Sequence, residues 1–169
     1  FIQEGYVEKV DFSSSDRFYL NGERLVLTAG TYGADNAVYH TQNENFNKIE
    51  QDGTGNNANF ILWDKNGRKL FFGSTADSKL GDVTNTHFWY LSKIEDYDGN
   101  TIDYTYANDE NGFRLQSIDY SGNIVNFYYD KRSDINTFYN MGAEMKLNLL
   151  LREIEVKGQG QVIWKYNFN

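Results

Sequence analysis

The chain has 169 residues, a length that suits one domain or two closely joined ones. Its formal net charge is −8 and its sixteen Lys and Arg residues are scattered, which argues against nucleic acid or an anionic membrane surface as a partner. Cysteine is absent, so disulfides, thiolate zinc sites and a cysteine nucleophile are excluded, and no apolar run approaches the ~20 residues of a transmembrane helix.

The first half of the chain, residues 1–86, is predicted to form short strands joined by tight turns. A strand is expected at 6–12, and the stretch at 37–51 predicts either one bent strand or two short ones. Two hairpins are expected where Asn-Gly stands between apolar-rich arms, at residues 17–28 and 60–73. Three stretches rich in Gly, Asn, Asp and Ser are expected to be loops, the last with room for a helical turn: residues 29–36, 52–59 and 74–85.

The second half, residues 87–169, contains one motif three times. Each copy has Leu-x-x-Ile, then a glycine-containing turn, then two aromatic residues separated by one position. The copies begin at Leu91, Leu115 and Leu151, and they end in Tyr104-x-Tyr106, Phe127-x-Tyr129 and Trp164-x-Tyr166. Since apolar and polar residues alternate on both sides of each turn, each copy is predicted to be strand, turn, strand. A lone hairpin is unstable in water, so the copies are expected to join one sheet.

Two stretches of this half leave room for other interpretations. Residues 128–142 are less regular than the repeats around them. Residues 146–156 are rich in Leu and Glu and could form a helix, but Leu147, Leu149 and Leu151 alternate, which favours a long strand. No linker divides the chain. The sequence therefore predicts one all-β domain over residues 1–169, an antiparallel sheet of sequential hairpins.

The motif Leu-x-x-Ile, Asp-x-x-Gly-Asn, Tyr-x-Tyr resembles the YD (Rhs) repeat. The order of the surrounding segments resembles the SpvB-type domain near the start of Tc-toxin B components and related YD-repeat toxins, over residues 16–168. The segments that carry this resemblance are DRFYLNGERLV (16–26), YHTQNENFNKI (39–49), FILWDKNGRKLFFGST (60–75), WYLSKIEDYDGNTIDYTY (89–106), YYDKRSD (128–134) and LLLREIEV (149–156). The chain departs from the family pattern in having no proline, including the stretch where Ser133 stands.

What the resemblance implies is a structural, non-enzymatic role. In that family, segments of this kind open a large β-shell that encloses a separate C-terminal effector and keeps it apart until delivery. The expected partners are therefore the rest of the shell and an effector, and the expected location is secreted or at the bacterial cell surface. The chain is expected to be a fragment that ends before a long run of repeats. Its sheet edges would then be unpaired, and we expect them to favour self-association.

Three groups of residues could form a catalytic or metal site, but each also has a structural explanation. A family effector is an ADP-ribosyltransferase, and Glu153-Ile154-Glu155 with Ser74-Thr75 superficially offers parts of such a site, but the two Glu fall on one face of a strand. Asp96, Asp98 and Asp103 could hold calcium, although the glycine of this turn is misplaced for an EF-hand. His40 and His87 have no spacing that supports a metal or acid–base site. No catalytic, cofactor or metal residue is assigned.

The aromatic residues support a second functional hypothesis. Trp63, Trp89 and Trp164, with thirteen Tyr on an acidic β-scaffold, are also typical of a carbohydrate-binding or adhesin module, in which rings stack on sugar faces. Regular alternation within strands favours packing for these rings instead. A third hypothesis, a glycoside hydrolase, would need two carboxyl groups ~5–10 Å apart across a cleft, and the sequence shows no such pair.

Overall fold

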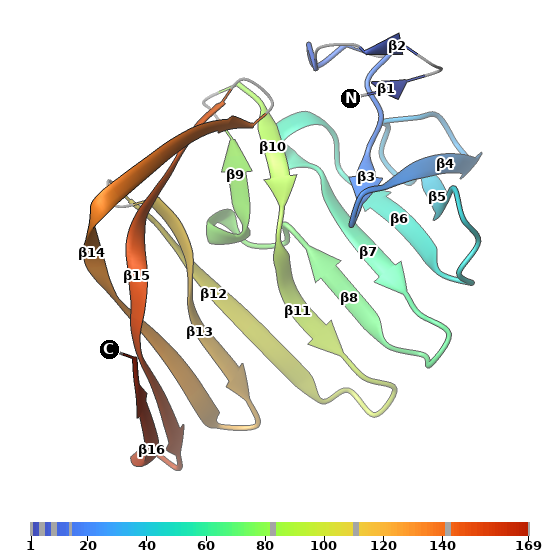
Figure 1. Cartoon of the computed structure of the whole chain (residues 1–169). Coiled ribbons are helices and arrows are strands. Elements are labelled where there is room, and N and C mark those ends of the chain that lie inside the picture. The colour runs from blue at the N-terminus through green and yellow to red at the C-terminus, as the bar shows by residue number, and fades with distance from the viewer. Residues whose placement is uncertain are drawn as a thin grey trace.

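The computed structural model describes residues 2–3, 6–7, 10–13, 15–81, 84–109, 112–140 and 143–168. Twelve strands form one antiparallel sheet in the order β16-β15-β14-β13-β12-β11-β8-β7-β6-β5-β4-β3 (Figure 1). Within the described residues there is no α-helix, so the all-β prediction is confirmed. The strands of this sheet are β3 (Tyr19–Leu20), β4 (Glu23–Ala29), β5 (Val38–Thr41), β6 (Lys48–Asp52), β7 (Asn59–Trp63), β8 (Lys69–Phe72), β11 (Leu91–Glu95), β12 (Thr101–Asp109), β13 (Gly112–Tyr120), β14 (Asn123–Asn140), β15 (Ala143–Gly158) and β16 (Gln161–Asn167).

Two small ladders lie outside the main sheet. β1 (Ile2–Gln3) pairs with β2 (Tyr6–Val7), and β9 (Lys79–Gly81) pairs with β10 (Thr86–Trp89). Two 3₁₀ turns, η1 (Gly55–Asn57) and η2 (Ala76–Ser78), stand in the predicted loops. The predicted strand at 6–12 was wrong in its extent: only Tyr6–Val7 is strand, residues 8–9 lie outside the described residues, and residues 10–12 are irregular.

Both predicted Asn-Gly hairpins are confirmed, as β3–β4 and β7–β8, and residues 37–51 form the two short strands β5 and β6. The β7–β8 and β11–β12 turns share one construction. Asp64 and Asp96 each use Oδ1 to accept the backbone N–H groups two and four residues later, at 2.8–3.0 Å. Gly67 and Gly99 stand at the same place in these turns with φ of +79° and +83°, which a side chain would strain.

The three repeats form consecutive hairpins at one side of the sheet, β11–β12, β13–β14 and β15–β16, as predicted. Residues 146–156 lie within the long strand β15, so the strand interpretation is confirmed over the helix. The expectation that 128–142 is irregular was wrong, because β14 runs to Asn140. Its irregularity is confined to a break in the register with β15 between Lys131 and Asn136.

One face of the sheet carries the apolar rows. Because opposed residues of neighbouring strands share a face, the ladder aligns Ile49, Leu62, Leu70, Ile94 and Ile102 across five strands. A second row on the same face runs across β12 to β16 and consists of Tyr104, Ile118, Val125, Val156 and Trp164. The apolar residues of the alternating sequence pattern therefore lie on one face of the sheet, and the polar residues between them lie on the other face.

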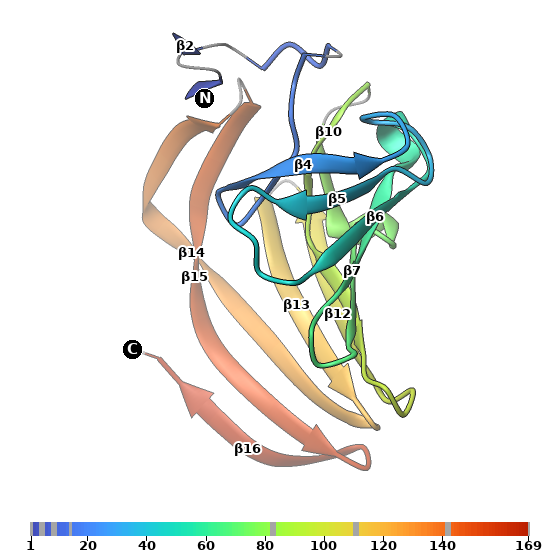
Figure 2. The ribbon, with the colours of Figure 1, turned by 90° about the vertical axis from the view of Figure 1, so that its right-hand side faces the viewer.

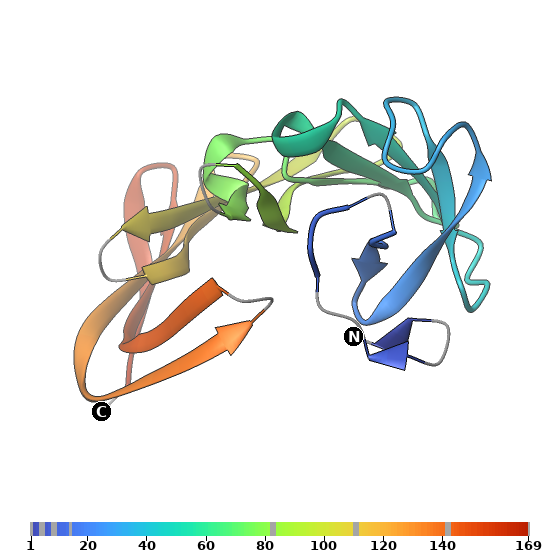
Figure 3. The same ribbon diagram turned by 90° about the horizontal axis from the view of Figure 1, so that it is seen from above.

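The core lies where this apolar face is covered by the chain's own loops. Phe18, Tyr32 and Trp89 pack over a buried cluster on β4 to β7. The sheet curves into an open arch, and the segment that leads into β3 lies inside the curve (Figures 2 and 3). The buried members of the cluster are Leu25, Ala37, Tyr39, Ile49, Phe60 and Leu62. The core is thus at the N-terminal end of the sheet, on its concave side.

Candidate functional site

The structure does not bring the three tryptophans together. Trp89 packs edge-on against Phe18 and Phe60, and its Nε1–H donates to the carbonyl oxygen of Ala58 at 2.8 Å. Trp63 lies on the opposite face of β7 from the core, 4.7 Å from its ring centroid to the Lys48 ammonium. Trp164 lies on the edge strand β16, seven strand positions from β7, which is roughly 30 Å at the usual strand spacing.

The paired glutamates lie in an ionic cluster on the polar face. Glu155 is 5% exposed, with Lys157 Nζ and Lys165 Nζ each 3.0 Å from its carboxylate, and the Tyr128 hydroxyl donates to it at 3.1 Å. Hydrogen bonds from these two ammonium groups lower the pKa of Glu155 to about 2. Glu153 also pairs with Lys165, at 3.1 Å. The carboxylates therefore anchor the β15–β16 hairpin.

Ser74 and Thr75 are engaged in local hydrogen bonds. The Ser74 hydroxyl lies 2.6 Å from that of Ser92, and Thr75 caps η2 through Ser78. The buried Ser92 hydroxyl donates to the Phe71 carbonyl oxygen, at the irregularity of the β8–β11 ladder. These hydroxyls complete a turn and a bulge.

Asp96, the first residue of the calcium hypothesis, uses both of its oxygens within its own turn. Besides the two backbone groups on Oδ1, its Oδ2 accepts the Asn100 side-chain amide at 2.9 Å, and these bonds lower its pKa. His40 lies with Nδ1 2.6 Å from the Thr41 carbonyl oxygen, and the His87 ring packs on Phe12. Over the described ranges, no three His, Asp or Glu side chains gather as metal ligands would.

A role that sequence reasoning missed belongs to the last tyrosine of the first two repeats. The Tyr106 hydroxyl donates to the Leu91 carbonyl oxygen at 2.7 Å, and the Tyr129 hydroxyl donates to that of Leu115 at 2.9 Å. In both repeats the acceptor is the first residue of Leu-x-x-Ile. Burial raises the pKa of Tyr106 to about 12 and also raises that of Tyr129. We call each of these bonds a tyrosine strut.

The struts stand where paired strands diverge. β11 pairs with β12 only up to Lys93 and Asp103, and β13 pairs with β14 only up to Ser117 and Asn126. Beyond these pairs the backbone carbonyls lose their partners, and a phenolic hydroxyl replaces the missing ladder bond. The similar spacing between leucine and tyrosine, 15 positions in the first copy and 14 in the second, is the signal that could have identified the struts.

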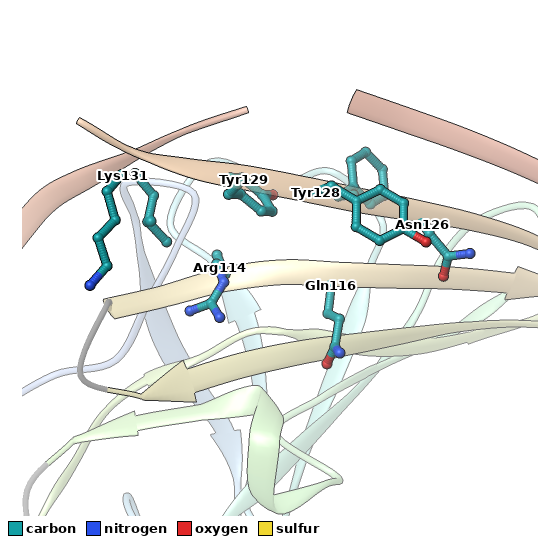
Figure 4. A pocket seen from close by; sticks show the side chains of 8 residues that line it. Arg114, Gln116, Asn126, Tyr128, Tyr129 and Lys131 are labelled. Carbon is teal, nitrogen blue, oxygen red and sulfur yellow. The ribbon is translucent and has the colours of Figure 1, made fainter. Parts of the chain in front are cut away.

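The second divergence encloses a hollow of about 410 Å³. It lies between β13 and β14 (Figure 4), and Leu149 of β15 also lines it. Its polar lining comes from both strands, and the rings of β14 form its remaining wall. The residues that Figure 4 labels around it are Arg114, Gln116, Asn126, Tyr128, Tyr129 and Lys131.

The edge strand β16 is exposed along its whole length. Trp164 is 62% and Tyr166 55% exposed on the apolar face, because no described segment covers this end as Phe18 and Trp89 cover the other. β16 has a strand partner, β15, on one side only. Its outer backbone groups therefore form an open edge, beside an uncovered apolar surface.

The fold defines an open, curved antiparallel sheet assembled from tyrosine-bearing hairpins. No protein-family model and no curated protein matches the sequence. In structure it is similar to the N-terminal domain of effector protein SpvB from Salmonella typhimurium strain LT2, with a TM-score of 0.76 and 19% identity over 88% of this chain and 71% of that one. The chain thus shares the fold of that domain.

Two Tc-toxin structures share the fold. The chain is similar to the TcdB2-TccC3 crystal structure, with a TM-score of 0.75 and 15% identity over 89% of this chain and 11% of that one. It is also similar to the Photorhabdus luminescens Tc holotoxin pore, with a TM-score of 0.68 and 15% identity over 80% of this chain and 10% of that one. The chain thus has a Tc-toxin-related fold and spans about a tenth of these two chains.

Across the described residues no helix is long and apolar enough to cross a membrane.

Proposed function

We propose that this chain is a non-enzymatic structural module of a large exported bacterial toxin-like protein of the YD-repeat type. It contributes strands to a β-shell, and the shell encloses or presents a C-terminal effector. The observation that carries the proposal is the open edge of β16 together with the uncovered apolar face beside it, in a fold shared with Tc-toxin chains of which the match covers about a tenth.

The two ends of the sheet support this role differently. At the β4–β8 end the chain covers its own apolar face with Phe18, Tyr32 and Trp89. At the β14–β16 end the same face is open, and the side chains exposed on it are aromatic: Trp164 is 62% and Tyr166 55% exposed. Water-exposed surface of this kind is costly, so it favours a protein layer that covers it in the assembled protein.

The edge has few of the features that protect free edges, and one of them is a register irregularity with β15 between Val156 and Lys157. β16 contains no proline, and its single charged residue, Lys165, is held by Glu153 and Glu155. Isolated edge strands in monomeric proteins usually carry outward charges or proline that prevent pairing. The outer backbone groups of β16 are therefore the place where we expect a further strand to pair.

The proposal can be tested on this chain by sedimentation velocity over a range of concentrations. We expect a weight-average sedimentation coefficient that rises with concentration, because the open edge and apolar face pair with other copies. Trp164→Lys should weaken the association, whereas Tyr97→Lys, at an 89% exposed turn position away from the edge, should not. A strict monomer at the highest concentration would contradict the proposal.

A further inference from the structure

The two strand divergences are built alike but filled differently. In the first, η2 inserts beside β12, and the Asp77 carboxylate Oδ2 accepts the backbone N–H of Tyr106 at 2.8 Å. Figure 1 shows η2 beside the upper ends of β11 and β12, where these strands separate. The Tyr106 strut to Leu91 crosses the same place. An acidic side chain on a one-turn helix thus completes the first divergence.

Among the residues that the structure describes, the second divergence has the strut but no such insertion. Tyr129, which corresponds to Tyr106 in the repeat, spans to Leu115 in the same way. Tyr129 lines the hollow of about 410 Å³, as Tyr106 contacts η2 in the first divergence. This volume lies within the ~300–1,000 Å³ range of ligand sites and suits a short peptide turn. The contact of Asp77 with Tyr106 at the first divergence is therefore a model, within the same chain, for a ligand of the hollow at the second divergence.

The charged residues that line the hollow are cationic, whereas the Asp77 side chain at the first divergence is anionic. The lining residues of the hollow include Arg114, Lys131, Gln116 and Asn126, and no Asp or Glu is among those that the structure describes there. The Asn126 amide also donates to the neighbouring Glu155 carboxylate, at 3.4 Å. Arg114 is held in place by Asp109 through two hydrogen bonds of 2.9 and 2.8 Å. Among the residues that the structure describes, none forms an ion pair with Lys131. Figure 4 shows that the Arg114, Gln116 and Lys131 side chains extend to the same side of their strands.

We propose that the hollow between β13 and β14 receives a carboxylate-bearing turn of a partner polypeptide, as the first divergence receives Asp77 of η2. The ammonium of Lys131 and the amides of Gln116 and Asn126 supply charge-assisted and neutral hydrogen bonds to the carboxylate. The rings of Tyr128 and Tyr129 pack on the aliphatic part of the turn. This proposal does not depend on the shell, since it concerns a different surface from the β16 edge.

The test is an NMR titration of the ¹⁵N-labelled chain with a capped peptide of residues 73–80, Gly-Ser-Thr-Ala-Asp-Ser-Lys-Leu. We expect saturable shifts of the amides around Arg114, Gln116 and Tyr129. The same peptide with Asn in place of Asp should bind about tenfold more weakly, because the charge-assisted bonds are lost. Acetate alone, at the same concentrations, should not reproduce the shifts.

Variants separate the hollow from general charge effects. Lys131→Gln should weaken peptide binding about fivefold and Lys131→Glu more, since both remove the cation. Lys65→Glu, at the exposed β7–β8 turn, makes the same charge change away from the hollow and should leave binding unaltered. The proposal is overturned by shifts that never saturate or map elsewhere, by equal binding of the Asp and Asn peptides, or by acetate producing the same shifts.

Discussion

Replacement of Trp89 by alanine tests whether the tryptophans pack or bind. The ring is half-buried between Phe18 and Phe60, so the low end of the range for core aromatic truncation applies, about 3 kcal/mol. The Ala58 carbonyl oxygen also loses its donor, which costs about 1 kcal/mol more. The expected loss is about 4 kcal/mol, a large part of the ~5–15 kcal/mol of an ordinary domain.

The assay is urea unfolding followed by far-ultraviolet circular dichroism. With a urea dependence of about 2 kcal/mol/M, Trp89→Ala should lower the midpoint by about 2 M. Trp164→Ala is the matched control and should cost less than about 0.5 kcal/mol, because its ring is 62% exposed on the edge strand. Equal losses for the two variants, or a stable Trp89→Ala protein, would refute the assignment of Trp89 to the core.

The remaining predictions concern the struts and pH. Tyr106→Phe and Tyr129→Phe should each cost about 1–2 kcal/mol in the same assay, since a carbonyl oxygen loses its donor, whereas Tyr97→Phe, 89% exposed, should cost nothing measurable. At high pH, Tyr106, whose pKa burial raises to about 12, holds its proton in the folded state after the unfolded chain has lost it. Stability should therefore fall between about pH 10 and 12, less steeply in Tyr106→Phe; an unchanged slope would contradict this. At low pH, Glu155, with its pKa lowered to about 2, contributes stability that is complete above about pH 4.5 and lost as the pH falls towards 2. Glu155→Gln should flatten the acid limb of a stability–pH curve, and an unaltered limb would show that its ion pairs are irrelevant.

The hairpins could be predicted from the sequence because their determinants are local. Gly22 and Gly122 adopt φ of +85° and +77° in two-residue turns, and period-two alternation on either side fixes the strands. The same alternation correctly placed Leu147 to Leu151 in a strand rather than a helix. In these segments the turn residues and the side-chain periodicity predict the same structure, and contacts with distant segments do not change it.

The features that the sequence did not reveal depend on contacts between distant segments. β14 continues to Asn140 because β15 pairs with it across a break in register, which no local signal in 128–142 announces. Asp77 contacts Tyr106, 29 positions later, and the hollow beside the second repeat is lined by residues of three different strands. Trp63, Trp89 and Trp164 share a residue type but stand on different faces or strands, which composition alone could not distinguish.

The central proposal is that this sheet forms one part of a larger β-shell. Electron cryomicroscopy of the complete gene product tests it most directly. The account predicts a further strand paired with the outer edge of β16, a protein layer over Trp164 and Tyr166, and an effector polypeptide on the concave side. A complete protein in which the β16 edge and this apolar face stay exposed to solvent would contradict it.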